Sequence, residues 1–194
     1  MSMSAPAYPI TVEADDAAPQ GRLGVFFRIL LVIPHLIVLL LLGLVTSLIT
    51  FVAWFTILFT GGYPEGMMNF VINVSHWSTR VSGYMFLLTG TYPPFAMGPD
   101  DSYPVRLIAQ GETEGRNRLT TFFRIFMLIP QVIVLYFVQI ALEVVGLIAW
   151  FAALFTGRVP GGLHSFLTGG LRWQTRVNLY GSLITDKYPP FGLN

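Results

Sequence analysis

Two long apolar runs dominate the pattern of hydrophobic and polar positions along the chain. Each holds about thirty residues, more than the roughly 20 that a helix needs to cross a bilayer. The runs predict one helix over Val25–Phe59 and another over Thr121–Phe155. Glycine and proline follow each run, and a less apolar segment comes next. This order predicts second helices over Pro64–Thr89 and Pro160–Thr185.

Each apolar run is longer than a simple membrane span. At a rise of about 1.5 Å per residue it measures roughly 50 Å, against a hydrocarbon layer of about 30 Å. Pro34 and Pro130 lie near the start of the runs, where a proline removes one backbone hydrogen bond and bends the helix axis. We therefore favour a kinked, tilted span for each run. The alternative is a helical hairpin that is broken near Gly43 or Gly146.

The second half of the chain repeats the first at a constant spacing of 96 residues, the difference between Arg28 and Arg124. The register holds without an insertion from Arg22 to the Tyr-Pro-Pro-Phe segments at residues 92–95 and 188–191. Such self-similarity indicates a duplicated unit. We expect two tandem repeats of two helices each. With two crossings per repeat, the repeats would be parallel and related by a pseudo-twofold axis along the membrane normal.

Composition makes a membrane protein the expected class. Hydrophobic residues account for 54% of the chain and charged residues for 11%, whereas soluble domains carry about 25% charged residues. A soluble chain of 194 residues would leave much of this apolar surface in water. The net charge of +1 gives no support for a nucleic-acid partner. The absence of cysteine excludes disulfides and thiolate metal sites.

The expected fold class is an all-α membrane protein with about four transmembrane helices. We divide the chain into an N-terminal segment at 1–25, a first membrane repeat at 26–95, a linker at 96–121, and a second repeat with its tail at 122–194. Short strand-like segments begin at Tyr8 and Tyr103. Basic residues concentrate in the N-terminal segment, the linker and the tail, so the positive-inside rule predicts that the termini and the linker are cytoplasmic.

A polar stripe marks each second helix. Its members recur at spacings of four, three and four, which places them on one helical face. They are Asn69, Asn73, His76 and Arg80, with Ser165, Gly169, Arg172 and Arg176 as their counterparts. A polar face on a membrane helix must contact protein, water or lipid headgroups. We favour second helices that span and line the interior; the alternative is that they lie in the membrane interface.

Spaced motifs identify a family. The first copy contains Phe26-Phe27-Arg28, Ile33-Pro34-His35 and Ala53-Trp54-Phe55, and the second contains Phe122-Phe123-Arg124, Ile129-Pro130 and Ala149-Trp150-Phe151. In these segments the chain resembles a bacterial membrane family known as domain of unknown function 4389, over nearly its whole length from Tyr8. Departures are small: Gly62 replaces an arginine, and Gln131 stands where the first copy has His35. The resemblance implies a tandem-repeat protein of the bacterial inner membrane, without an activity or catalytic residue to carry over.

The first candidate site combines arginine and aromatic residues on the second helices. In each of them an arginine follows a tryptophan by three positions and precedes a tyrosine by four, so the three share a face. This pattern predicts a contact site for an anion, such as a lipid phosphate or the carboxylate of a partner. The alternative is structural, with arginines bonded to carbonyl groups and an interfacial aromatic belt. The candidates are Arg80, Arg176, Arg172, His76, Trp77, Trp173, Tyr84 and Tyr180.

A second candidate is an intramembrane polar pair. Gln139 and Glu143 lie one helical turn apart in the second apolar run, where the first run has Gly43 and Ser47. An intramembrane carboxylate raises the hypothesis of a functional, proton-linked group. The alternative is a hydrogen bond between the repeats or a salt bridge to an arginine of the second helices.

No catalytic, cofactor or metal motif is present in the sequence, and its three histidines lack ligand spacing. We therefore expect a protein without enzymatic activity or cofactor, whose partners are the lipid bilayer and other membrane subunits. The favoured hypothesis is an accessory or scaffold subunit of a larger bacterial membrane complex. The alternative is a small transporter or anionic-lipid-binding protein with a site between the two repeats. A membrane enzyme is the third hypothesis.

Overall fold

The computed structural model describes residues 8–193. Residues 1–7 of the predicted N-terminal segment, and Asn194 at the end of the predicted second repeat, lie outside the described residues. Within them, two strands and five helices follow one another along the chain. In order, they are β1 (Ile10–Ala14), α1 (Arg22–Thr60), α2 (Glu65–Met85), β2 (Val105–Ala109), α3 (Arg118–Phe122), α4 (Arg124–Thr156) and α5 (Gly161–Gly181).

The two apolar runs form the two longest helices, α1 and α4. α1 continues without a break through Gly43, and α4 continues through Gly146, so the helical-hairpin alternative is wrong. Each helix contains its proline and ends at a glycine, Gly61 or Gly157, whose φ of 78° or 75° lies in the left-handed region that glycine adopts most readily.

Both long helices are long and apolar enough to cross a membrane. Only 11% of the most apolar window of each is buried inside the protein, which distinguishes them from the core helix of a soluble domain. Neither α2 nor α5 meets the same criteria, so two of the four predicted membrane helices are supported by length and composition.

The second repeat departs from the first at the start of its long helix. The predicted helix begins at Thr121, whereas the structure has a short α3, then Phe123, and then α4. Phe123, with φ of −88° and ψ of 9°, deviates from regular helix geometry, although its N–H still bonds the carbonyl of Leu119 at 3.1 Å. Asn117 caps α3 by accepting the N–H groups of Leu119 and Thr120.

The helices α2 and α5 end earlier than the sequence predicts. After α2, Leu87 adopts a left-handed conformation with φ of 60°. The N–H of Leu88 then bonds the carbonyl of Gly83 at 2.9 Å, which closes the helix as in a Schellman motif. Leu183 has a φ of 64° after α5, and the N–H of Ile184 closes that helix in the same way. Both leucines are at most 2% exposed, and their burial offsets the cost of this conformation.

The predicted strand-like segments pair with each other. β1 and β2 form an antiparallel two-stranded sheet in which Val12 lies opposite Leu107. The strands correspond at a spacing of 95 residues, the difference between Tyr8 and Tyr103, so Val12 faces its own counterpart in the duplication. An approximate twofold axis therefore passes through the centre of the sheet.

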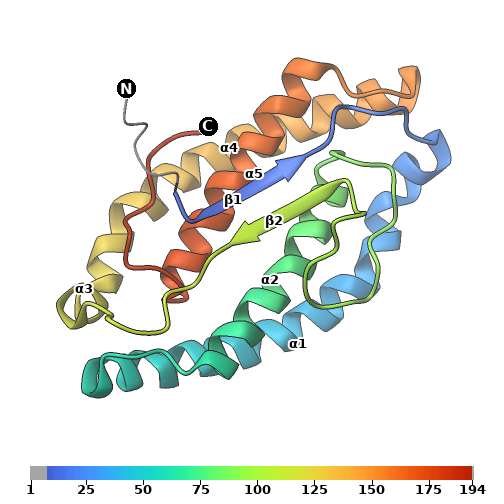
Figure 1. Cartoon of the computed structure of the whole chain (residues 1–194). Coiled ribbons are helices and arrows are strands. Elements are labelled where there is room, and N and C mark those ends of the chain that lie inside the picture. The colour runs from blue at the N-terminus through green and yellow to red at the C-terminus, as the bar shows by residue number, and fades with distance from the viewer. Residues whose placement is uncertain (1–7, 194) are drawn as a thin grey trace, which may run out of the picture.

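The elements form three layers (Figure 1). The sheet covers α2 and α5, which contact each other, and α1 and α4 form the layer behind them. The strands are exchanged between repeats: β1 packs on α5, whereas β2 packs on α2. Gly83 allows this close approach, since an added Cβ would lie 2.8 Å from the side chain of Val105. The exchange ties the two repeats into one unit.

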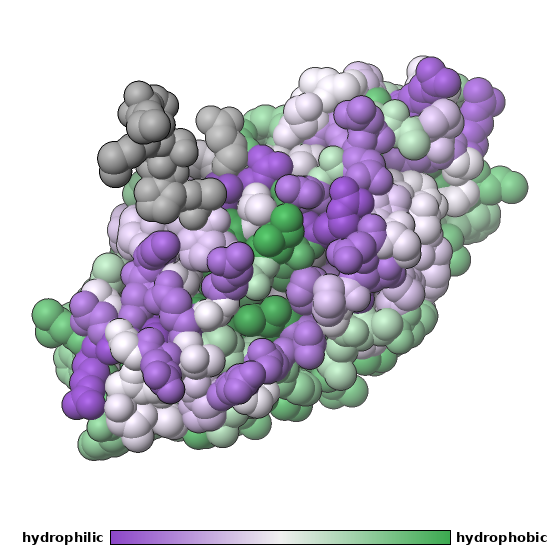
Figure 2. All heavy atoms as spheres, in the orientation of Figure 1, coloured by the Kyte–Doolittle hydropathy of each residue, from purple (hydrophilic) through white to green (hydrophobic). Residues whose placement is uncertain are grey.

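Polarity follows the layers. Figure 2 shows mostly hydrophilic residues on the face that carries the sheet, and hydrophobic residues along the rim of the molecule. The outer layer exposes large aliphatic and aromatic side chains along almost the full length of both long helices. Examples are Leu30, Leu40, Leu48, Phe59, Phe126, Phe137, Leu147 and Phe155, which are between 58% and 78% exposed. Soluble monomers rarely expose so large an apolar patch.

Candidate functional site

The two repeats meet through equivalent contacts. The indole N–H of Trp54 on α1 donates to the carbonyl of Thr121 at 3.0 Å, and that of Trp150 on α4 donates to the carbonyl of Val25 at 2.9 Å. The two donors are 96 residues apart in sequence, and so are the two acceptors. The approximate twofold symmetry therefore extends from the sheet to the layer of long helices.

Two clefts lie between the repeats. They have volumes of about 460 Å³ and about 360 Å³. The Arg28 cleft is lined by Arg28, Ile29, Leu87, Glu143, Gly146 and Trp150. The Arg124 cleft is lined by the six equivalent residues, Arg124, Ile125, Leu183, Ser47, Thr50 and Trp54. Since the duplication maps one set onto the other, the clefts are two copies of one site.

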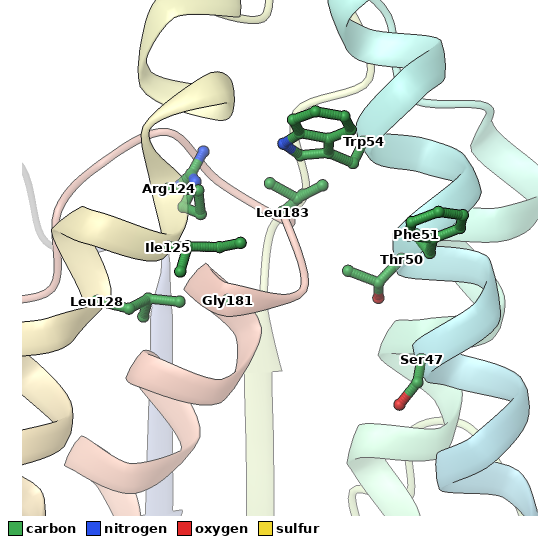
Figure 3. A pocket seen from close by; sticks show the side chains of 9 residues that line it. All are labelled: Ser47, Thr50, Phe51, Trp54, Arg124, Ile125, Leu128, Gly181 and Leu183. Atoms are coloured by element: carbon green, nitrogen blue, oxygen red, sulfur yellow. The ribbon is translucent and has the colours of Figure 1, made fainter.

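Each cleft combines side chains from both repeats. In the Arg124 cleft, side chains of α4 face side chains of α1, and the turn after α5 lies between them (Figure 3). The α4 wall has Arg124, Ile125 and Leu128, and the α1 wall has Ser47, Thr50, Phe51 and Trp54. Except for the arginine and two hydroxyl groups, these side chains are apolar or aromatic. Such a lining suits a hydrocarbon chain.

The arginines of the two clefts differ in their partners. Arg124 forms an ion pair with Asp186 at 2.6 Å, and it also donates to the carbonyl of Thr185 at 3.0 Å. Its guanidinium carbon lies 3.9 Å from the centre of the Tyr180 ring. Arg116 forms a second ion pair with Asp186 at 2.8 Å, so one carboxylate neutralises part of the charge of two buried cations.

The environment of Asp186 favours its charged form. Burial alone would raise the pKa of this carboxyl. Hydrogen bonds from Arg116 and from the backbone N–H of Asn117, together with the charges of Arg116 and Arg124, outweigh that effect and lower the pKa below its ordinary value. Asp186 is therefore ionised at neutral pH and holds the end of the second repeat against the start of α3 and α4.

Arg28 has no carboxylate partner among residues 8–193. It donates to the side-chain oxygen of Gln20 at 2.5 Å, to the carbonyl of Thr89 at 3.1 Å, and to the carbonyl of Tyr84. All three acceptors are neutral. The duplication explains the difference, because Gln20 and Gly90 stand where the second repeat has Arg116 and Asp186.

The predicted arginines of the second helices bind backbone carbonyl groups. Arg80 donates to Gly98 and Ala96 at 2.7 and 2.5 Å, which holds the segment after the Tyr-Pro-Pro-Phe motif. Arg172 and Arg176 donate to the carbonyls of Val12 and Ile10 in β1, at 2.9 and 3.1 Å. These contacts correspond to the structural alternative. The structure does not bring the arginines of the two helices into one pocket among those it describes.

The predicted tryptophans and tyrosines face the long helices. Trp77 donates to the Nδ1 atom of His35 at 3.1 Å, and Trp173 donates to the side-chain oxygen of Gln131 at 2.9 Å. The glutamine thus takes the acceptor role of the histidine in the second repeat. Tyr84 and Tyr180 lie against the cleft arginines. Thus each tryptophan and tyrosine contacts α1 or α4. The arginine between them binds backbone carbonyl groups instead, at the start of the linker for Arg80 and in β1 for Arg176.

His76 lies half-buried on α2, near Arg80. Burial and the nearby charge of Arg80 lower its pKa, and the described part of the chain has no group of three His, Cys, Asp or Glu side chains that could hold a metal ion.

The predicted polar pair is formed. Gln139 donates to Glu143 at 3.2 Å and accepts a hydrogen bond from Gln174 on α5 at 2.5 Å. One alternative was a salt bridge from Glu143 to an arginine of α2 or α5. Among residues 8–193, Glu143 forms no such salt bridge. It lines the Arg28 cleft instead.

Comparison with known proteins places the chain in a family. The family described as Domain of unknown function (DUF4389) matches residues 22–97 and 118–192. The chain belongs to this family. The two matched segments confirm both the resemblance and the tandem repeat in this DUF4389 protein. No curated protein and no solved structure matches the chain.

Sequence reasoning missed the cleft arginines of this DUF4389 chain. Arg28 and Arg124 belong to the repeated Phe-Phe-Arg motif, but their position at the start of an apolar run suggested only a membrane-flanking charge. The available signal was that both the arginine and the tyrosine recur at the repeat length of 96 residues, Arg28 with Arg124 and Tyr84 with Tyr180. Asp186 had no such signal, because its counterpart is Gly90.

Proposed function

We propose that this protein is a non-enzymatic membrane protein that binds phospholipid in the two clefts between its repeats. The observation that carries the proposal is the pair of equivalent clefts, each with apolar walls and one buried arginine. An apolar wall accommodates an acyl chain, and a guanidinium group binds a phosphate. The expected location remains the bacterial inner membrane.

The placement in the bilayer that we propose follows from the layers. The apolar outer faces of α1 and α4 would be immersed in lipid, and the sheet would face water. If the protein crossed the bilayer four times, α2 and α5 would also span it. The sheet packs along both helices. It would then place exposed Glu13, and Arg106 opposite it in β2, at membrane depth. Charged groups in hydrocarbon cost several kcal/mol each, about 3 on insertion scales.

This placement gives a bound lipid a consistent orientation. The turns after α2 and α5 lie in the middle layer and form part of each cleft, whereas the outer walls belong to the long helices. A headgroup would lie near the arginine, and its acyl chain would extend between the outer walls of the cleft toward the bilayer centre. The cleft therefore suits a lipid that keeps its normal direction in the leaflet.

The test compares two glycine substitutions of the purified protein. Gly146 lines the Arg28 cleft, Gly43 lies in α1 outside both clefts, and an added Cβ at either would meet no heavy atom within 4 Å. In mild detergent, mass spectrometry is expected to find phospholipid bound to the unmodified protein. Gly146→Leu should lose about half of it, because it fills one of two sites, whereas Gly43→Leu should retain it. Equal retention by both variants would reject the proposal.

An accessory or scaffold role in a membrane complex is the second candidate. The exposed aromatic side chains of α1 and α4 favour it, because helices of a partner could pack on them as well as lipid could. Affinity purification from native membranes tests this role. A stoichiometric partner protein would support it, and recovery of this chain alone would count against it.

A further inference from the structure

The two clefts have the same position in the fold but different charges. At the position of Ser47 in the Arg124 cleft, the Arg28 cleft has the carboxylate of Glu143. The cation of the Arg124 cleft is already paired with Asp186. The Arg28 cleft thus presents one cation and one carboxylate that are not paired with each other or with any other charged side chain of residues 8–193.

Arg28 keeps its charge available. Its side chain is deeply buried, with only 3% of the residue exposed, and its Nε atom has no hydrogen-bond partner in the described part of the chain. Its three bonds go to neutral oxygens. A buried guanidinium without an anion is costly in a protein surrounded by lipid. An anionic group that enters the cleft would therefore gain a strong, charge-assisted interaction.

Glu143 is fixed on the opposite wall. Gln139 donates to its carboxylate, and Gln139 is itself held by Gln174 from the neighbouring helix. The chain of hydrogen bonds orients the carboxylate but supplies no positive charge. A purely anionic headgroup bound at Arg28 would be repelled by Glu143, whereas a headgroup that also carries a cation would satisfy both groups.

We propose that the Arg28 cleft binds a zwitterionic phospholipid whose headgroup carries a phosphate and a primary ammonium. This inference rests on the proposed function and names the ligand class of one of its two sites. The phosphate binds Arg28, the ammonium binds Glu143, and an acyl chain lies along Ile29, Leu147 and Trp150. The Arg124 cleft takes an acyl chain without this headgroup preference, because its arginine is neutralised by Asp186 and Ser47 replaces the carboxylate.

The experiment measures headgroup preference in nanodiscs that contain equal amounts of phosphatidylethanolamine and phosphatidylglycerol. After transfer to detergent, native mass spectrometry counts each lipid on the unmodified full chain and on Glu143→Ser, which installs the residue of the other cleft. The matched control is Ser47→Ala, which changes the equivalent position without altering charge. Both positions face a cleft rather than the packed core, so the variants are expected to fold.

The Arg28 cleft should retain phosphatidylethanolamine over phosphatidylglycerol by about threefold, the ratio expected from one partly screened ion pair. Because the Arg124 cleft adds lipid without this preference, the total count on the unmodified protein should favour phosphatidylethanolamine by about 1.7-fold. Glu143→Ser should abolish or reverse this preference, and Ser47→Ala should keep it. Retention of lipid with no preference, or an unchanged preference in Glu143→Ser, would overturn the inference while the proposed function stands. The absence of retained lipid in every variant would reject both.

Discussion

The carboxylate of Asp186 lies between Arg116 and Arg124, whose side chains are almost completely buried. It also accepts the backbone N–H of Asn117 at 2.7 Å. One short side chain thus connects the end of the second repeat with the linker and with the start of the apolar helix. Removal of its charge would leave two buried cations without an anion, which is more harmful than the loss of an ordinary surface pair.

Asp186→Asn is expected to lower the free energy of unfolding by about 3 to 5 kcal/mol, the range for a broken buried ion pair. Thermal unfolding in detergent measures the change. The control is Asp15→Asn, which breaks the exposed pair with Arg106 at 2.7 Å and should cost less than about 1 kcal/mol. Similar losses in the two variants would contradict the assigned role of Asp186.

The same carboxylate predicts a dependence on pH. Its pKa is lower in the folded protein than the ordinary value of 3.8. The stability contributed by the charged form is therefore complete above that ordinary value and is lost as the pH falls through the lowered folded value. The difference in stability between the unmodified protein and Asp186→Asn should shrink in this acidic range, as unfolding curves at several pH values would show.

At the scale of elements, a close contact between α4 and α5 depends on one glycine. A Cβ added at Gly170 would lie 2.2 Å from Leu142, which is fully buried. The equivalent positions of the first repeat hold Val74 and Thr46. In the second repeat the smaller residue of the pair, glycine, is on α5 and the larger one, leucine, is on α4. In the first repeat the equivalent α2 position holds valine and the equivalent α1 position holds threonine.

Gly170→Val is expected to destabilise the protein by about 1 to 3 kcal/mol, because it forces an extra side chain into a packed contact. The double variant Gly170→Val with Leu142→Thr should recover much of this loss, since it installs the combination of the first repeat. Gly43→Ala is the control, because an added Cβ there meets nothing within 4 Å. Thermal unfolding of the unmodified protein, the single variants Gly170→Val and Leu142→Thr, and the double variant gives a coupling energy. A value near zero would contradict direct packing of the two positions.

The elements themselves differ in how far sequence could predict them. The apolar runs and their terminal glycines predicted α1 and α4 closely, because the length of an apolar run and one cap residue define each helix. The ends of α2 and α5 could not be predicted in this way. They depend on leucines in a left-handed conformation that only burial makes tolerable, and burial arises from the tertiary fold.

The candidate sites show the same limit at the scale of the whole molecule. Sequence spacing correctly placed Arg80, Trp77 and Tyr84 on one helix. It could not reveal that the arginine binds the start of the linker while both aromatic residues face α1. The clefts depend on contacts between repeats, and the exchanged strands that fix these contacts pair across 95 residues, the difference between Val12 and Leu107. Local patterns carry no information on such long-range pairing.

Two placements of the whole molecule in the membrane differ in where the two ends of α1 lie. If α1 crosses the bilayer, its two ends lie on opposite sides; if it lies in the plane of one leaflet, both ends lie on the same side. The chain contains no cysteine, so a single introduced cysteine is the only reactive thiol. Ala18 precedes α1 and Glu65 follows it, and both are exposed. They provide positions whose labelling reports the two ends separately.

We expect a membrane-impermeant maleimide to label Ala18→Cys and Glu65→Cys from the same side of sealed vesicles, because the sheet and the middle layer cover one face of the long helices. Leu44→Cys, on the exposed apolar face of α1, should react only after detergent is added. Labelling of Ala18→Cys and Glu65→Cys from opposite sides would establish that α1 spans the bilayer. The charged sheet would then require a water-filled surrounding or a partner protein, because lipid alone cannot solvate Glu13 and Arg106.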